Sequence, residues 1–135
     1  MSSIKRYNPG SLKVPTKAYS NGVLIPLGVA DIMFTTGQLS QNEDGTVHAP
    51  DDVEAQTRHI YKRIETILGE ADMTLDHIVK AQIFVTNIED GAIVAKVRDE
   101  LLSANPPAST LLEVSKLLKP EYKVEIEVIA VKLNS

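Results

Sequence analysis

The sequence feature that most constrains the fold is an alternation of apolar and charged residues near the C-terminus. Residues 124–131 read Val-Glu-Ile-Glu-Val-Ile-Ala-Val. Successive side chains of a β-strand point to opposite faces of its sheet, so this period of two predicts a strand with one apolar face. Val124, Ile126 and Val128 are expected to share that face, and Glu125 and Glu127 to share the other.

Two carboxylates on one strand face have a structural and a chemical interpretation. In the structural one, glutamates opposite lysines stabilise neighbouring strands modestly, and a charged strand face is commonly a solvated one. Lys80, Lys116 and Lys119 are the candidate partners. In the chemical one, a carboxylate held near a small substrate acts as a general base. The residue pattern alone leaves both interpretations open.

Length and composition predict one globular domain without a metal. The chain has 135 residues, which fits one domain. Residues 1–16 are polar and interrupted by prolines, so we expect an N-terminal arm followed by a single domain over 17–135. There is no cysteine, which excludes disulfides and thiolate chemistry. The three histidines have no metal-ligand spacing, so no metal is expected.

Charge and hydropathy disfavour two classes of partner. The formal net charge is −4 and no basic run occurs, whereas nucleic-acid affinity depends on clustered Lys and Arg. No apolar run approaches membrane-spanning length, and the first residues lack the apolar core of a secretory signal. We therefore expect a cytoplasmic protein that binds neither nucleic acid nor membrane.

The order of predicted elements indicates the fold class. Strands are expected within residues 19–29 and 32–36, a helix from about 51 to 72, a strand over 78–85, a helix from about 90 to 105, and two final strands within 106–131. This order predicts an α+β fold with a single mixed sheet and two helices packed on one face.

Two finer expectations concern the first helix and the sheet. Asp51 is expected to cap the helix, with Glu54 three residues later as in a capping box. The strand over 78–85 alternates little and is predicted to be buried on both faces. Ile83, Val85 and Ile129 would then make the face opposite the helices too apolar for water, which requires a partner chain.

The C-terminal motifs resemble those of a known family. Pro107-Ala108, Glu113-Val114 and the alternating residues 124–131 resemble the signature of the reactive-intermediate deaminases (Rid, YjgF-like), and the resemblance extends from about Tyr19 to Val131. It implies a chorismate-mutase-like fold assembled as a homotrimer with clefts between subunits. It also implies hydrolysis of a small-molecule enamine or imine to a carbonyl compound and ammonia, without a cofactor.

The resemblance assigns roles to individual residues. Glu125 matches the carboxylate that activates water, and Tyr19 matches the tyrosine of the cleft. Thr36 and Gly37 match the Ser-Gly pair of the family's Ser-Gly-Gln motif, so Thr36 keeps the hydroxyl. The backbone of Leu111 matches the position that helps to orient the water and the imine nitrogen.

Three positions depart from the family pattern. Ser109 replaces the arginine that clamps the substrate, Ala95 replaces an asparagine, and Leu111 replaces a cysteine. An arginine grips a carboxylate through two parallel hydrogen bonds, and a serine cannot. The expected substrate range is therefore shifted away from ordinary 2-imino acids.

Further alternatives remain open at the level of the sequence. The cleft of the same trimer could bind a small molecule, or regulate a partner, without catalysis. Lys17 stands two residues before Tyr19 and is a candidate substitute cation, although its interpretation as a solvated charge is favoured. Ribonuclease activity, a name attached to parts of the family, is disfavoured by the acidic composition.

Overall fold

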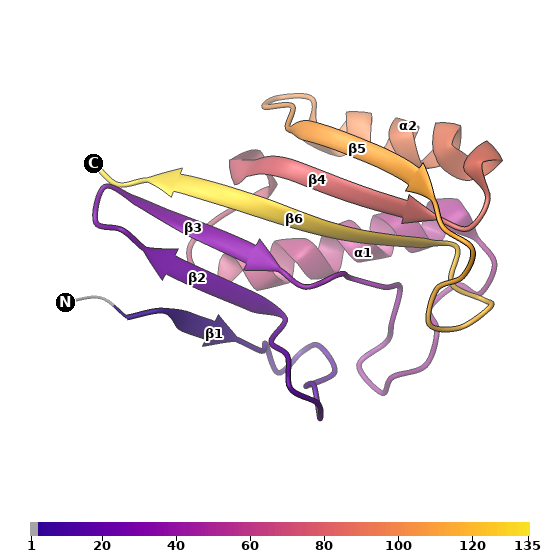
Figure 1. Ribbon diagram of the computed structural model, residues 1–135, viewed down its shortest axis with the longest axis horizontal. Coiled ribbons are helices and arrows are strands. Elements are labelled where there is room, and N and C mark those ends of the chain that lie inside the picture. The colour runs from indigo at the N-terminus through magenta and orange to yellow at the C-terminus, as the bar shows by residue number, and fades with distance from the viewer. Residues whose placement is uncertain (1–2) are drawn as a thin grey trace.

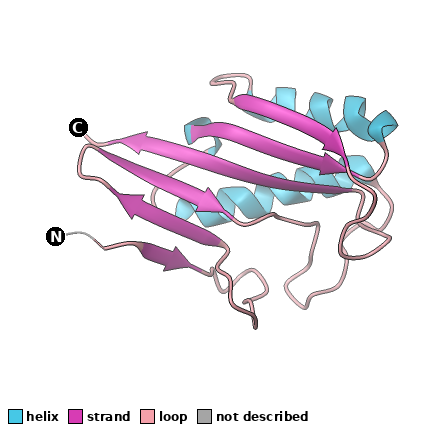
Figure 2. Ribbon diagram, viewed as in Figure 1, coloured by secondary structure: helices cyan, strands magenta, loops and turns pink. Residues whose placement is uncertain are grey.

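The computed structural model describes residues 3–135, which form one six-stranded sheet with two helices on one face (Figures 1 and 2). The strands are β1 (Lys5–Tyr7), β2 (Gly22–Pro26), β3 (Ala30–Thr35), β4 (Ile78–Val85), β5 (Ala108–Glu113) and β6 (Val124–Leu133). The helices are α1 (Val53–Gly69) and α2 (Gly91–Leu102), with 3-10 turns η1 (Leu75–His77) and η2 (Ile88–Asp90).

The sheet is mixed, which confirms the predicted α+β class. Its strand order is β1-β2-β3-β6-β4-β5, and every neighbouring pair is antiparallel except the parallel pair β4 and β5. Much of the predicted N-terminal arm lies outside the regular elements, but residues 5–7 add β1 to the edge of the sheet. No helix within residues 3–135 is long and apolar enough to cross a membrane.

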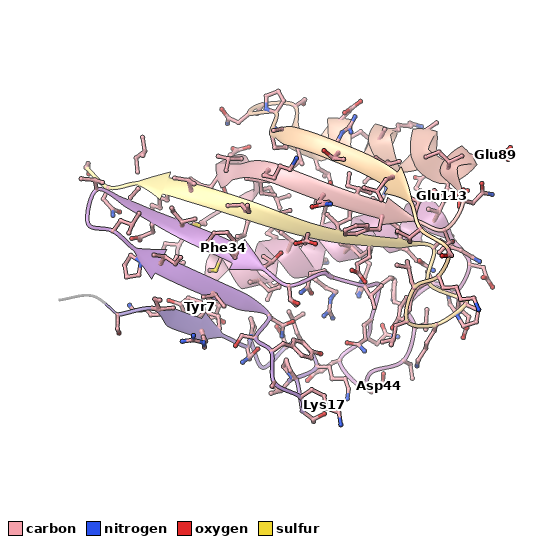
Figure 3. The ribbon with its side chains drawn as sticks, viewed as in Figure 1. Tyr7, Lys17, Phe34, Asp44, Glu89 and Glu113 are labelled. Atoms are coloured by element: carbon pink, nitrogen blue, oxygen red, sulfur yellow. The ribbon has the colours of Figure 1, made fainter. Side chains whose placement is uncertain are left out.

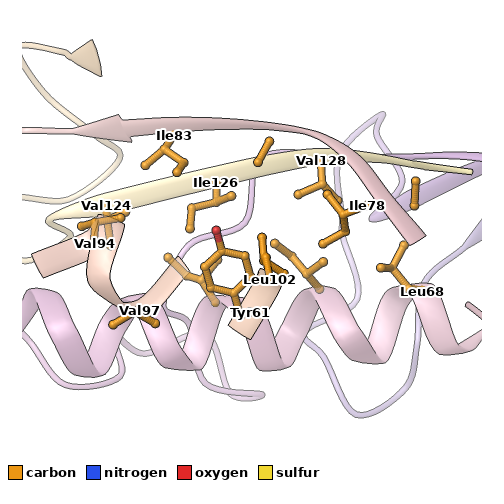
Figure 4. Packing of buried hydrophobic residues seen from close by; sticks show 14 of the residues in the cluster. Tyr61, Leu68, Ile78, Ile83, Val94, Val97, Leu102, Val124, Ile126 and Val128 are labelled. Carbon is orange, nitrogen blue, oxygen red and sulfur yellow. The ribbon is translucent and has the colours of Figure 1, made fainter. Parts of the chain in front are cut away.

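The alternating stretch forms the central strand β6, as predicted. Val124, Ile126, Val128 and Ala130 are at most 2% exposed and face the two helices. Figure 4 shows this layer packed against Tyr61 and Leu68 of α1 and against Val94 and Val97 of α2. Burial of this aliphatic layer supplies the main driving force for the fold.

The prediction for the faces of β4 was wrong. Ile83 and Val85 are fully buried beneath the helices, and Gln82 and Phe84, which alternate with them, are only partly buried. The opposite face of the sheet, called the open face below, is nevertheless partly apolar. Ile129 of β6 lies there beside Phe34 of β3, which is 41% exposed. The apolar open face therefore exists, but β3 and β6 supply it instead of the buried side chains of β4.

The first helix begins one residue later than predicted. The N-cap is Asp52, whose carboxylate accepts the Ala55 N–H at 3.0 Å. Asp51 has a φ of 64°, in the left-handed region, which places it in the preceding turn. Asp72, at the predicted end of this helix, has a φ of 56°, also in the left-handed region.

Strand β3 leaves β6 at a bulge that shapes the open face. The last regular pair is Phe34 with Ile129, and the chains meet again only at the bridge between Gln38 and Ile126. Residues 35–37 thus face only residues 127–128, which is the extra-residue arrangement of a β-bulge. The Thr35 hydroxyl accepts the Val128 N–H at 3.0 Å in place of a backbone carbonyl.

Candidate functional site

The bulge places Glu125 against the backbone of Gly37. Glu125 is half-buried on the open face of β6, where it pairs with Phe84 of β4. A Cβ atom built on Gly37 would lie only 2.8 Å from the carboxyl carbon of Glu125. Because that approach leaves no room for a side chain, glycine at position 37 allows the carboxylate to occupy this site. The structure thus brings together two of the residues singled out from the sequence.

The surroundings of Glu125 disfavour its negative charge. Burial raises the pKa of the Glu125 carboxyl, and the neighbouring Glu127 raises it further. The ion pairs of residues 3–135 involve neither glutamate, so the lysines suggested as partners by the sequence do not neutralise them. A carboxyl group with a raised pKa and no ion-pair partner is typical of a functional position.

Glu125 also borders a hollow on the open face. The hollow has a volume of about 370 Å³, and its wall includes Phe84 of β4 and Leu117 and Leu118 of the segment after β5. Lys116 contributes the one cation of the lining. The volume and the mixed apolar and charged wall suit a small organic molecule.

Of the other predicted site residues, Thr36 belongs to the bulge, and Tyr19 and Lys17 lie in the loop between β1 and β2. The Thr36 N–H donates to the Asn21 carbonyl at 2.9 Å. This hydrogen bond fixes the backbone directly before Gly37. Tyr19 is 54% exposed, and its N–H donates to the Lys17 carbonyl at 2.9 Å. Figure 3 shows Lys17 in the loop between β1 and β2, and β5 forms the opposite edge of the sheet.

A buried polar network beneath the bulge was missed by sequence reasoning. Arg63 of α1 is only 6% exposed and donates from Nε to Gln38 Oε1 at 3.1 Å and from Nη1 to the Gln41 carbonyl at 2.8 Å. Gln38 Nε2 in turn donates to Asn21 Oδ1 at 3.3 Å. Burial lowers the pKa of Arg63. The one available signal was its place three residues after Ile60, on the apolar stripe of α1.

The network fixes the loop that carries the predicted cleft residues. Gln38 follows Gly37 directly, and Asn21 holds Thr36 through its carbonyl. Arg63 therefore supports the position of the bulge from the helix side of the sheet, and it acts through Gln38 instead of reaching the open face.

Ser109 and Leu111 lie on the other side of the sheet. In the parallel pairing of β4 and β5, Ser109 is opposite Ala81 and Leu111 is opposite Ile83. Both β4 residues are fully buried beneath the helices, so Ser109 and Leu111 point to the helix side, whereas Glu125 points to the open face. One chain therefore does not bring Glu125 together with Ser109.

The backbone of Leu111 lies at an unpaired sheet edge. The Val114 N–H donates to the Val85 carbonyl at 2.8 Å, so every second N–H before it also faces β4. The N–H and C=O of Leu111 fall on the alternate positions and point away from β4, toward the free edge of β5. This edge is available to a ligand or to another chain.

The histidines make contacts that do not depend on a metal. The rings of His48 and His59 stack with their centroids 4.0 Å apart. His48 Nδ1 lies 3.1 Å from Asn42 Oδ1, and His59 Nε2 lies 3.0 Å from the Gln41 carbonyl. Across residues 3–135, no group of three or more His, Cys, Asp and Glu side chains is arranged to hold a metal ion.

Sequence comparison relates the chain to proteins of one family. The sequence model of the Endoribonuclease L-PSP family matches residues 11–132. A RutC family protein of Buchnera aphidicola is 33% identical over 132 residues, which cover 96% of this chain and 98% of that protein. A RutC family protein of Pyrococcus abyssi is 30% identical over 104 residues, which cover 77% of this chain and 81% of the relative.

Solved structures agree with the sequence relatives. A Rid-family protein of Yersinia pestis, described as of unknown function, superposes with a TM-score of 0.85 at 32% identity, over 95% of this chain and 98% of that one. YjgF of E. coli gives 0.79 at 31% identity, and E. coli TdcF with bound serine gives 0.80 at 26% identity, each with the same coverage. The chain therefore belongs to the Endoribonuclease L-PSP family, the family of the RutC and YjgF (Rid) proteins.

Proposed function

We propose that the protein is a hydrolytic deaminase of a reactive enamine or imine, in which Glu125 activates the attacking water. The observation that carries this proposal is the setting of Glu125: a half-buried carboxyl with a raised pKa that lies against Gly37 and borders a hollow of about 370 Å³. A carboxylate with a raised pKa is a stronger base than an ordinary glutamate.

The chemistry requires one water and one proton carrier. As the water oxygen bonds to the imine carbon, the C=N electron pair moves onto nitrogen, and Glu125 takes a proton from the water and delivers it to that nitrogen. In the carbinolamine that results, Glu125 takes the hydroxyl proton and delivers it to nitrogen, the C–N bond breaks, and ammonia leaves as the carbonyl forms. One imine and one water thus yield one carbonyl compound and one ammonia, and an enamine enters this route as its imine tautomer.

The proposed site is completed by a second copy of the chain. Glu125, Gly37 and Thr36 face the open side, whereas Ser109 and Leu111 lie beside the free edge of β5. A homotrimer in which the β5 edge of one copy meets the open face of the next would unite them, with Tyr19 at the rim of the cleft. The partly apolar open face, where Phe34 is 41% exposed, supports such an assembly.

The substrate range of the proposed enzyme is shifted away from ordinary 2-imino acids. Ser109 offers no forked cation to a carboxylate beside the reacting carbon. Lys17 remains a candidate substitute only through assembly, because it lies near the β1 edge of its own sheet, opposite the β5 edge. The family description names an endoribonuclease, but the net charge of −4 disfavours RNA as the ligand. We expect the protein to work in the cytoplasm.

A second candidate is a non-catalytic trimer that binds or senses a small molecule. The replacement of the clamping arginine by Ser109 favours it, and the E. coli relative TdcF was solved with bound serine, which is a small amino acid. In this alternative the hollow beside Glu125 binds a ligand but does not turn it over.

Ammonia release from a panel of unstable enamines distinguishes the two candidates. Wild-type protein is expected to release ammonia faster than buffer, and Glu125→Gln is expected to abolish the difference while it leaves the assembly intact. Glu127→Gln is the matched control, because it makes the same change on the same strand face, and it is expected to retain turnover when assayed at a pH above the acidic limb. Equal turnover by Glu125→Gln and wild type would remove the catalytic role of Glu125, and no turnover by wild type would favour the binding protein.

A further inference from the structure

A second cavity lies on the helix side of the sheet, at the start of β5. It has a volume of about 440 Å³ and is bounded by the end of α2, the turn after it and the first residues of β5. Leu102, Pro106 and Pro107 give it apolar walls, and Arg98, Asp99 and Ser109 supply its polar groups. An apolar cavity with a few convergent polar groups is the usual form of a small-ligand site.

The cavity contains a guanidinium group beside the position that lost its arginine. Arg98 of α2 donates from Nη1 to Ser109 Oγ at 3.3 Å. Its side chain is only 25% exposed, so the walls of the cavity restrict its motion. Helix α2 therefore supplies a cation beside position 109, although Ser109 itself has no charge.

The guanidinium retains hydrogen-bonding capacity for a ligand. Asp99 Oδ1 lies 3.0 Å from both Nε and Nη2 of Arg98, and the Asp99 side chain is 69% exposed. An ion pair with so exposed a partner contributes little. The outer N–H groups of Nη1 and Nη2 have no further acceptor within residues 3–135. A ligand carboxylate that uses both would form the strong forked contact typical of arginine.

We propose that Arg98, seated on Ser109, is the anion anchor of this protein and binds the carboxylate of an acyclic imine or enamine whose carboxylate is separated from the reacting carbon by methylene groups. An arginine at position 109 would extend its guanidinium several bonds beyond its own Cβ. Arg98 instead places the charge beside the Ser109 hydroxyl, nearer to the strand. With the reacting carbon held beside Glu125, the anion of the ligand then lies further from its C=N bond than in a 2-imino acid.

The inference rests on the proposed deaminase for the reacting group, but anion binding is measurable without turnover. Two unreactive isomers, 2-oxopentanoate and 4-oxopentanoate, have equal charge and size and differ only in the separation of carbonyl and carboxylate. Titration calorimetry on the assembled protein is expected to show tighter binding of 4-oxopentanoate. Arg98→Gln is expected to weaken that binding by about 10- to 150-fold, the usual loss for a charge-assisted contact.

Three further variants make the test specific. Lys96→Gln removes the same charge from the same helix at an exposed position and is expected to leave binding unchanged. Asp99→Asn is expected to tighten binding, because it removes the competing carboxylate. Arg98→Lys is expected to recover only part of the affinity, because it keeps the charge and loses the fork.

The possible outcomes separate this inference from the proposed function. Unchanged affinity in Arg98→Gln, an equal loss in Lys96→Gln, or preference for 2-oxopentanoate would each overturn the anchor. Turnover that requires Glu125 together with binding that ignores Arg98 would refute the anchor alone. Carboxylate binding through Arg98 with no ammonia release from any enamine would refute the deaminase and leave the anchor standing.

Discussion

Replacement of Gly37 by alanine tests whether the site depends on the close approach of its backbone to Glu125. A new Cβ would lie 2.8 Å from the Glu125 carboxyl carbon and 3.2 Å from its Cγ. Gly37 does not have a positive φ, so alanine meets no backbone obstacle there. The clash therefore acts on the Glu125 side chain, which must rotate away from the bulge.

The structure predicts a large effect on turnover and a small one on stability. Displacement of a reacting group by about 1 Å can reduce the rate about 10²-fold. Since Glu125 is only half-buried and its side chain is flexible, we expect the free energy of unfolding to change by no more than about 1 kcal/mol. The assay is kcat/KM for ammonia release, measured beside thermal unfolding and sedimentation of the same preparation.

Two controls make the result interpretable. Gly10→Ala is the matched glycine change, because no atom lies within 4 Å of the added Cβ and the φ of Gly10 is not positive. Glu125→Asp in the Gly37→Ala background shortens the carboxylate, so the two changes together should cost less than the sum of their separate effects. Wild-type kcat/KM in Gly37→Ala, or a loss that only follows a fall in Tm, would refute the reasoning.

Three other predictions follow from the same geometry. Because burial raises the folded-state pKa of Glu125 above its ordinary 4.5, the stability that this group contributes is present below 4.5 and lost as pH rises through the raised value. Glu125→Gln should therefore have a larger free energy of unfolding than wild type in denaturant titrations at neutral pH. Glu127→Gln should lower the pKa of Glu125 and so move the acidic limb of the kcat/KM profile to lower pH. An unmoved limb would exclude the influence of Glu127. Ser109→Arg should raise activity on 2-imino acids, with a gain below the full contact value of about 10- to 150-fold because Arg98 lies beside the new charge; wild-type rates as high as those of the variant would show that another cation already serves. Sedimentation equilibrium should show a trimer at micromolar concentration, and a stable monomer would refute the shared site. Mixing Glu125→Gln with Arg98→Gln subunits should restore turnover in part, because some sites then combine an intact Glu125 from one subunit with an intact Arg98 from another.

The fold was predictable where the sequence is periodic. In β6, charged residues alternate with apolar ones, and this pattern determines both the strand and the face that it buries. In β4 the limits Ile78–Val85 were predicted correctly, but the assignment of Ile83 to the open face was wrong. An apolar run with little alternation does not encode its orientation, because tertiary packing against the helices decides which side is covered.

The site was predictable only as a set of residue types. Glu125 and Gly37 meet because β3 bulges away from β6, and no residue pattern in 35–37 distinguishes a bulge from a regular strand. Arg63 illustrates the opposite case. A charge on the buried stripe of a helix requires a specific partner, but sequence analysis did not single out Arg63, and Gln38 lies so far away in sequence that only the tertiary structure identifies it.

The alternation that makes β6 recognisable also explains why the proposed site needs more than one chain. Side chains on opposite faces of a sheet cannot be brought together by rotation about their own bonds. Glu125 is on one face and Ser109, with Arg98 above it, is on the other, so a single chain separates the proposed base from the proposed anchor. The two groups can act on one molecule only if the β5 edge of one copy lies over the open face of another. In that arrangement the anchor and the base are held by different subunits, and the distance between them is set by the packing of the assembly. A change of one residue in β5 or α2 can then alter which substrate fits while the geometry around Glu125 stays the same.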